Sequence, residues 1–176
     1  MNNHPKITID LVLDRHTTKE VLHAVLHSIL FHRLFGTVKP QIFDVLDVSM
    51  PGVNDEGMKQ LVHSKVEAFW KSIEGGVNKR GQIIVTFSEK RTQKRWFSTG
   101  EVCHLTNAGS ISELTSPRFL GRSALEQWIV NAEIRQPTTD RERQKFNADL
   151  AAALTQSLET MLTYTSSEQG RAAVPS

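Results

Sequence analysis

Two hydrophobic periods follow each other at the start of the chain. Apolar residues occupy every second position from Ile7 to Leu13, which predicts a half-buried strand over 7–13. From Leu22 to Leu34 they recur every three or four positions, the spacing of a helix with one buried face. Thr17 and Glu20 have the spacing of a capping box at the start of this helix, and Gly36 predicts its end.

A second strand and a second helix are predicted next. Residues 41–50 are rich in β-branched side chains and lie between Pro40 and Pro51, which favours one strand. Asn54 is a suitable helix N-cap, and Gly75 and Gly76 predict the end of the helix it opens. The apolar stripe of this helix is Leu61, Val62, Val66, Phe69 and Ile73.

The remaining pattern predicts two strands, a long loop between them and a final helix. Residues 82–88 form one strand, and residues 125–135 alternate in a way that lets them pair with it. Residues 89–123 are rich in Ser, Thr, Asn, Gly and Arg and are predicted to be a long loop. Thr139 and Glu142 form a second capping box, at the start of a long helix.

The order of these elements predicts the fold class. Strands and helices do not repeat as β-α-β units, so we predict an α+β fold with about three helices on one face of a mainly antiparallel sheet. Residues 1–165 are predicted to form a single domain, and the polar residues 166–176 a disordered tail.

Composition narrows the possible functions only slightly. The chain has 176 residues, is 39% hydrophobic and carries a formal charge of +2, which is too weak to require nucleic acid. Cys103 is the single cysteine, so no disulfide can form within the chain. No secretory signal and no apolar run of membrane-spanning length is present, and we expect a soluble, cytoplasmic protein.

Catalytic and metal-binding patterns are weak. His23 and His27 are four residues apart on the first predicted helix, but no Glu lies between them, so they are interpreted as histidines beside an apolar stripe. Cys103 and His104 are neighbours in sequence, which does not place a thiol and an imidazole in catalytic geometry. We therefore expect no enzyme activity, no cofactor and no metal.

The strongest functional signal is an aromatic pair in a basic stretch. Trp96 and Phe97 follow four cations (Lys90, Arg91, Lys94 and Arg95) and lie on no apolar period. An exposed aromatic pair of this kind is typical of a binding site for another protein. It is an equally good interpretation that the loop folds back and buries both rings in the core.

The same stretch permits a different function. Basic residues beside two aromatics, the Lys90–Phe97 loop, could bind single-stranded nucleic acid through phosphate contacts and stacking. They could equally meet an anionic membrane surface, and a simply solvated loop is the commonest case. A small nucleic-acid-binding domain is therefore the alternative function.

Four segments resemble the autophagy-related protein 101 family of HORMA-domain proteins. They are residues 21–36 of the first helix, Gly81–Gln82 at the start of a strand, residues 94–98 after that strand, and the strand around Trp128 together with residues 140–144. The resemblance extends over about residues 5–165.

This resemblance implies a HORMA fold and a scaffold that has no enzyme activity. The family pairs with the HORMA domain of autophagy-related protein 13 and stabilises it in the kinase complex that initiates autophagy, at the phagophore assembly site. By position, Trp96 and Phe97 match the family's WF finger, which recruits downstream autophagy factors. His32 and Arg33 match a family signature that we place near the partner interface.

Two differences from the family pattern are visible. The family finger reads Trp-Pro-Phe, whereas Trp96 and Phe97 are adjacent, so which ring points outward is open. The chain also stops soon after the long helix, and we therefore expect the C-terminal safety-belt region of other HORMA proteins to be truncated.

Overall fold

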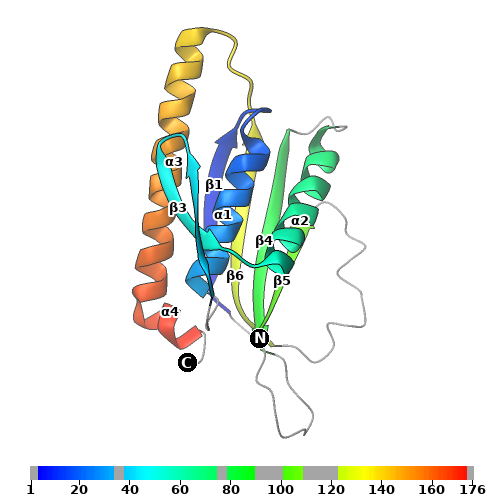
Figure 1. The fold of residues 1–176 in the computed structure, drawn as a ribbon, viewed down its shortest axis with the longest axis vertical. Coiled ribbons are helices and arrows are strands. Elements are labelled where there is room, and N and C mark those ends of the chain that lie inside the picture. Colours follow the sequence, from blue (N-terminus) through cyan, green and yellow to red (C-terminus); the bar gives the residue numbers. More distant parts are fainter. Residues whose placement is uncertain (1–3, 34–37, 75–78, 90–100, 109–122, 174–176) are drawn as a thin grey trace, which may run out of the picture.

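A computed structural model describes residues 4–33, 38–74, 79–89, 101–108 and 123–173. Within these ranges, four strands form one sheet in the order β1-β6-β4-β5 (Figure 1). The strands of this sheet are β1 (Lys6–Leu13), β4 (Arg80–Glu89), β5 (Glu101–Ala108) and β6 (Ser123–Ile134). The other elements are the helices α1 (Thr18–Arg33), α2 (Glu56–Glu74), α3 (Asp140–Ser166) and α4 (Glu168–Ala173), and the strands β2 (Pro40–Val45) and β3 (Val48–Val53).

The sheet is mainly antiparallel. Strand β4 pairs antiparallel with both β5 and β6, whereas β1 pairs parallel with β6. The predicted α+β class is therefore confirmed, as are the strands predicted over 7–13, 82–88 and 125–135. The arrangement is consistent with a HORMA-like fold.

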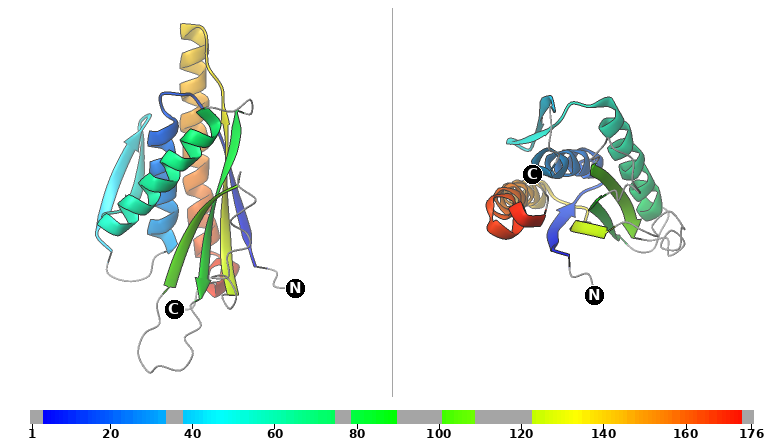
Figure 2. Two further views of the ribbon diagram at one scale, coloured as in Figure 1. Left: turned by 90° about the vertical axis from the view of Figure 1, so that its right-hand side faces the viewer. Right: turned by 90° about the horizontal axis from the view of Figure 1, so that it is seen from below.

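Helix α1 lies between the sheet and the ribbon formed by β2 and β3, as both views in Figure 2 show. Helix α2 packs beside α1, and α3 runs along the edge of the sheet that β1 forms. The described helices thus share one side of the sheet. None of them has the length and apolar character that a membrane span requires.

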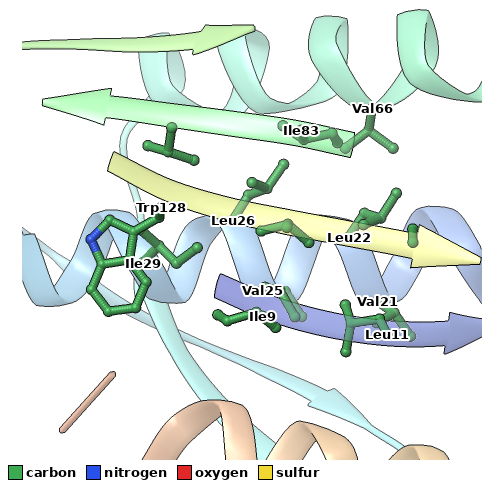
Figure 3. Close-up of a cluster of buried hydrophobic side chains, with 14 of the residues drawn as sticks. Ile9, Leu11, Val21, Leu22, Val25, Leu26, Ile29, Val66, Ile83 and Trp128 are labelled. Atoms are coloured by element: carbon green, nitrogen blue, oxygen red, sulfur yellow. The ribbon is translucent and has the colours of Figure 1, made fainter. Parts of the chain in front are cut away.

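The core forms where α1 meets the sheet. Leu22, Leu26 and Ile29 of α1 point at side chains of β1, β4 and β6, among them Ile9 and Trp128 (Figure 3). All three α1 residues are fully buried. Burial of each such side chain contributes about 1.5–3 kcal/mol relative to exposure, so this face of α1 dominates the packing.

The single strand predicted over 41–50 is in fact a hairpin. Strands β2 and β3 pair antiparallel, and the chain reverses at Leu46 and Asp47, which have φ angles of 48° and 63°. Two successive positive φ angles are the geometry of the two-residue turn that matches strand twist. The prediction was wrong because Leu46 and Asp47 are not the Asn-Gly or Asp-Gly pair that signals such a turn.

Two of the three predicted N-caps, Thr17 and Thr139, directly precede their helices, but only one of the two capping boxes is confirmed by its hydrogen bonds. The Thr139 hydroxyl accepts from the Glu142 amide at 3.2 Å, and the Glu142 carboxylate accepts from the Thr139 amide at 3.3 Å, which confirms that capping box. Before α1, however, Asp14 accepts from the amide and hydroxyl of Thr17 at 2.7 and 2.8 Å. Before α2, Asp55 accepts from the Met58 amide at 2.9 Å, in place of the predicted Asn54 cap.

The structure also differs from the loop and tail predictions. Strand β5 lies inside the stretch 89–123 that was predicted to be a loop, and its apolar residues do not alternate regularly with polar ones. The final helix α3 extends to Ser166, and α4 follows it in the predicted disordered tail. The predicted helix ends at Gly36 and at Gly75–Gly76 lie outside the described residues.

The positive φ angle of Asp47 in the β2–β3 turn leads to a prediction about stability. Replacing Asp47 with Val should destabilise the chain by about 1–2 kcal/mol, because a left-handed backbone is costly for a β-branched residue. Replacing Asp47 with Gly should leave stability equal or slightly higher, since Gly accepts a positive φ. Urea unfolding of both variants measures the difference, and equal midpoints for them would contradict the turn.

Candidate functional site

Arg33, the last residue of α1, is buried inside the chain. Its side chain is 1% exposed, and the carboxylate of Glu126, which pairs with it, is fully buried. Arg33 Nε donates to Glu126 Oε1 at 2.7 Å, and Nη2 donates to Oε2 in a second, shorter bond. This two-bond geometry joins the end of α1 to β6 across 93 residues of sequence.

Three further residues complete the surroundings of this ion pair. The indole Nε1 of Trp128 donates to Glu126 Oε1. Arg33 Nη1 donates to the Gly170 carbonyl of α4 at 3.1 Å, and the Arg33 guanidinium lies 5.1 Å from the ring centre of Tyr164 on α3. Each charge therefore has several partners, as a buried ion pair requires.

Tyr164 adds an aromatic wall to the pair. Its ring meets the ring of Trp128 edge-on, with 5.6 Å between the centroids. Burial raises the pKa of Tyr164 to about 12, and the nearby Glu126 carboxylate adds to the effect, while Arg33 opposes it. The phenol is therefore neutral at physiological pH.

Gly170 permits α4 to approach closely. A Cβ atom at this position would lie 1.9 Å from the Tyr164 carbonyl oxygen, which no side chain could tolerate. The Gly170 amide donates to the Ser167 hydroxyl at 3.0 Å, so the turn between α3 and α4 is fixed as well. We call Arg33, Glu126, Trp128, Tyr164 and Gly170 the Arg33 anchor.

The Arg33 anchor lies at the end of the sheet that flanks residues 90–100. Glu126 is opposite Phe87 of β4, two residues before that strand ends. Glu89 and Glu101, the residues on either side of 90–100, are paired with each other. The anchor therefore fixes the base from which this segment leaves the sheet.

The predicted finger residues, Trp96 and Phe97, and the whole Lys90–Phe97 stretch lie outside the described residues. Their roles stay predictions. Of the basic residues before this stretch, Arg80 is paired with Glu133 at 3.0 Å.

His32 and Arg33, the predicted partner-interface pair, have different surroundings. The His32 side chain is half-buried, with Nδ1 2.7 Å from the Ser28 carbonyl oxygen and its ring edge-on to Phe31. The polar contacts of Arg33 are all made to its own chain. Arg33 is 1% exposed, and its role at a partner interface stays a prediction.

His23 and His27, weighed above as metal ligands, face different neighbours. His27 is buried and stacks on Phe43 with ring centroids 4.8 Å apart, whereas His23 faces His63 on α2 at 5.6 Å. Burial lowers the pKa of His27 to about 4, and also lowers that of His23. Among the described residues, no group of three or more His, Cys, Asp or Glu side chains could hold a metal ion.

Sequence reasoning missed Glu126, although a signal was present. In the alternation of β6, positions 128, 130, 132 and 134 point into the core, and 126 belongs to the same series. An acidic residue at an inward position must have a partner, because a lone buried charge is strongly unfavourable. Nothing in the local sequence identifies that partner as Arg33.

The comparisons with known proteins agree on one family. The family model described as autophagy-related protein 101 matches residues 10–176. Autophagy-related protein 101 of Schizosaccharomyces pombe is 34% identical over 94 residues, which cover 53% of this chain and 51% of that protein. Its counterpart in Arabidopsis thaliana is 28% identical over 132 residues, covering 73% of this chain and 52% of that protein.

The fold and the anchor define an α+β protein whose helices and hairpin cover one side of a mainly antiparallel sheet. The chain belongs to the autophagy-related protein 101 family. This places it among the autophagy-related proteins, and confirms the family resemblance seen in its sequence. The matched stretch spans about half the length of each of these curated relatives.

The anchor makes a prediction about stability. Replacing Glu126 with Gln should destabilise the chain by about 3–5 kcal/mol, because Arg33 would keep its charge without an opposite one. A double variant, Arg33→Met with Glu126→Leu, should lose less unfolding free energy than Glu126→Gln alone. Urea unfolding measures all three chains.

Glu133→Gln is the matched control, since Glu133 lies on β6 like Glu126 and pairs with Arg80 and Arg135, but is partly exposed. It should change the unfolding free energy little. An equal loss of unfolding free energy in Glu126→Gln and Glu133→Gln would show that the buried Arg33–Glu126 pair contributes no more to stability than the exposed one.

His27 makes a prediction about pH. Its pKa is about 4 in the folded chain and near the ordinary histidine value of 6.5 when unfolded, so only the unfolded chain binds a proton on this residue between these pH values. Stability should therefore fall as the pH drops from about 6.5 to about 4, by up to about 3 kcal/mol from this residue. The lowered pKa of His23 acts in the same direction.

Urea unfolding at several pH values measures the slope. His27→Phe should flatten it, because the variant keeps a ring against Phe43 but cannot be protonated. His16→Phe, at an exposed position, is the control and should leave the slope unchanged. An unaltered slope in His27→Phe would contradict the assignment.

Proposed function

We propose that this chain is a non-enzymatic scaffold in the initiation of autophagy. In this proposal it forms a heterodimer with the HORMA domain of autophagy-related protein 13 and stabilises it in the autophagy-initiating kinase complex. The observation that carries the proposal is the match to the autophagy-related protein 101 family over residues 10–176. The site of action is then cytoplasmic, at the phagophore assembly site.

The second part of the proposal concerns recruitment. Trp96 and Phe97 form the finger that binds downstream autophagy factors. The paired ends of β4 and β5 support this role, because Glu89 opposite Glu101 gives residues 90–100 a fixed base. A short segment held at both ends loses less conformational freedom on binding than a free one.

The third part concerns the partner interface. His32 contributes a partly exposed ring at the end of α1. Arg33 acts as a positioning residue, because its bonds to Glu126 and Gly170 hold that end of the helix in place. Family membership supports a partner surface here, and the anchor supplies the rigidity that such a surface needs.

The finger is tested by replacing both Trp96 and Phe97 with Ala. The variant should fold normally and should still co-purify with the HORMA domain of autophagy-related protein 13 as a one-to-one complex in light scattering. Autophagosome formation should be lost in cells that carry only this variant, because recruitment depends on the two rings.

Ser98→Ala with Thr99→Ala is the matched control, since it changes the neighbouring positions and leaves both rings. Autophagosomes should form normally with it. Normal autophagy in the Trp96/Phe97 double variant would refute the finger, and failure of the unaltered chain to co-purify would refute the pairing. The two parts of the proposal therefore fail separately.

A further inference from the structure

The outer edge of β1 presents backbone groups without partners. In the parallel pairing with β6, Lys6 lies opposite Gln127, and the Gln127 amide donates to the Pro5 carbonyl at 3.0 Å. This register directs the N–H and C=O groups of Ile7, Ile9 and the following odd positions towards β6. The same groups of Lys6, Thr8 and Asp10 point away from the sheet, and no hydrogen bond from the described residues reaches them.

A groove runs along the first half of this edge. It has a volume of about 680 Å³ and lies between the start of β1 and the last turns of α3. Helix α3 stands beside the outer edge of β1, as the view from below in Figure 2 shows. The β1 side is lined by Pro5, Lys6, Ile7 and Thr8, and the opposite wall by residues that include Gln156, Glu159, Thr160 and Thr163.

The groove is lined by polar side chains with unused bonding capacity. Lys6 and Glu159 are both exposed, and neither forms an ion pair or a side-chain hydrogen bond within the described residues. The same is true of the hydroxyl of Thr8. Unpaired strand edges and free charges in one groove are features of a binding site for an extended chain.

We propose that this groove binds one extended segment of a partner protein, which adds to the sheet as a strand next to β1. The segment's backbone bonds to the outward groups of Lys6 and Thr8. A basic residue of the segment faces α3 and pairs with Glu159. This partner segment is a different one from the HORMA domain of the pairing proposed above, although Tyr164 of the Arg33 anchor also lines the groove.

The wall formed by α3 favours a single segment over a second copy of this chain. Two copies joined through their β1 edges would each bring an α3 to the same side of the joint, into the space beside β1. A lone strand has no such helix. Strands in a sheet lie about 4.8 Å apart, so a segment bonded to β1 would run directly between β1 and α3.

Side-chain alternation defines the chemistry of the segment. Every second residue of an added strand faces α3 and meets Glu159, Thr160 and Thr163, which suits a basic residue flanked by small polar ones. The residues between them face the open side of the sheet. A suitable probe is the blocked hexapeptide Thr-Val-Arg-Val-Thr-Val, in which Thr and Arg alternate with Val.

The test measures binding of this fluorescent hexapeptide to the full chain by anisotropy. We expect a dissociation constant below about 1 mM, and at least about tenfold weaker binding when its Arg is replaced by Glu. Amide hydrogen exchange at Lys6 and Thr8 should slow when the peptide binds. Exchange at Ile7 and Ile9 should change little, because β6 already occupies their amides.

Two pairs of variants isolate the contacts. Thr8→Pro removes one outward N–H and should abolish binding, and Pro is tolerated on an edge strand. Thr8→Val keeps that N–H and should preserve binding. Glu159→Gln should weaken binding of the Arg peptide, whereas Asp149→Asn, an exposed change on the same helix, should not.

Several outcomes would overturn the proposal. They are absence of peptide binding at about 1 mM, unchanged binding in Thr8→Pro, and slow exchange at Lys6 and Thr8 in the free chain, which would mean that the chain covers its own edge. Self-association that Thr8→Pro removes would assign the edge to a second copy. If Thr8→Pro does not fold, the comparison of Glu159→Gln with Asp149→Asn and the hydrogen exchange at Lys6 and Thr8 still test the proposal.

Discussion

The buried ion pair between Arg33 and Glu126 is the constraint on which the rest of the structure depends. Removing two such charges from water costs several kcal/mol for each, so the pair is tolerable only with every bond in place. Those bonds come from α1, β6 and α4, with Tyr164 of α3 alongside. Hydrophobic packing could tolerate small shifts of these elements, but the ion pair requires them to meet at one point.

The sequence predicted most of the strands and the apolar helix faces, because these repeat periodically, but it did not predict the contacts of the Arg33 anchor. The strands around Ile9, Ile83 and Val130 and the apolar faces of α1 and α2 were visible because burial there repeats every two or about 3.6 residues. For Arg33, the family resemblance predicted only a place near the partner interface. Its partner in the ion pair, Glu126, lies 93 residues away in sequence, and a local sequence pattern cannot predict a contact between residues so far apart.

The elements that escaped prediction share a physical reason as well. The β2–β3 turn is formed by Leu46 and Asp47 and not by the Gly or Asn that would signal it. Strand β5 has no regular apolar alternation and is stabilised as a strand by its pairing with β4. For α4, the docking of Gly170 against Tyr164 and Arg33 supplies what a six-residue helix lacks by itself. In each case tertiary contacts decide the local structure.

The anchor also sets the register of the edge strand. Gln127, which bonds to the Pro5 carbonyl, lies between Glu126 and Trp128, and Ile7 is opposite Trp128. A slip of β1 by one residue would turn its apolar side chains outward and would separate it from these bonds. The same few residues of β6 therefore fix the base of the segment 90–100 on one side and the outward groups of Lys6 and Thr8 on the other. The edge strand β1 and the paired ends of β4 and β5 therefore both depend on the same part of β6.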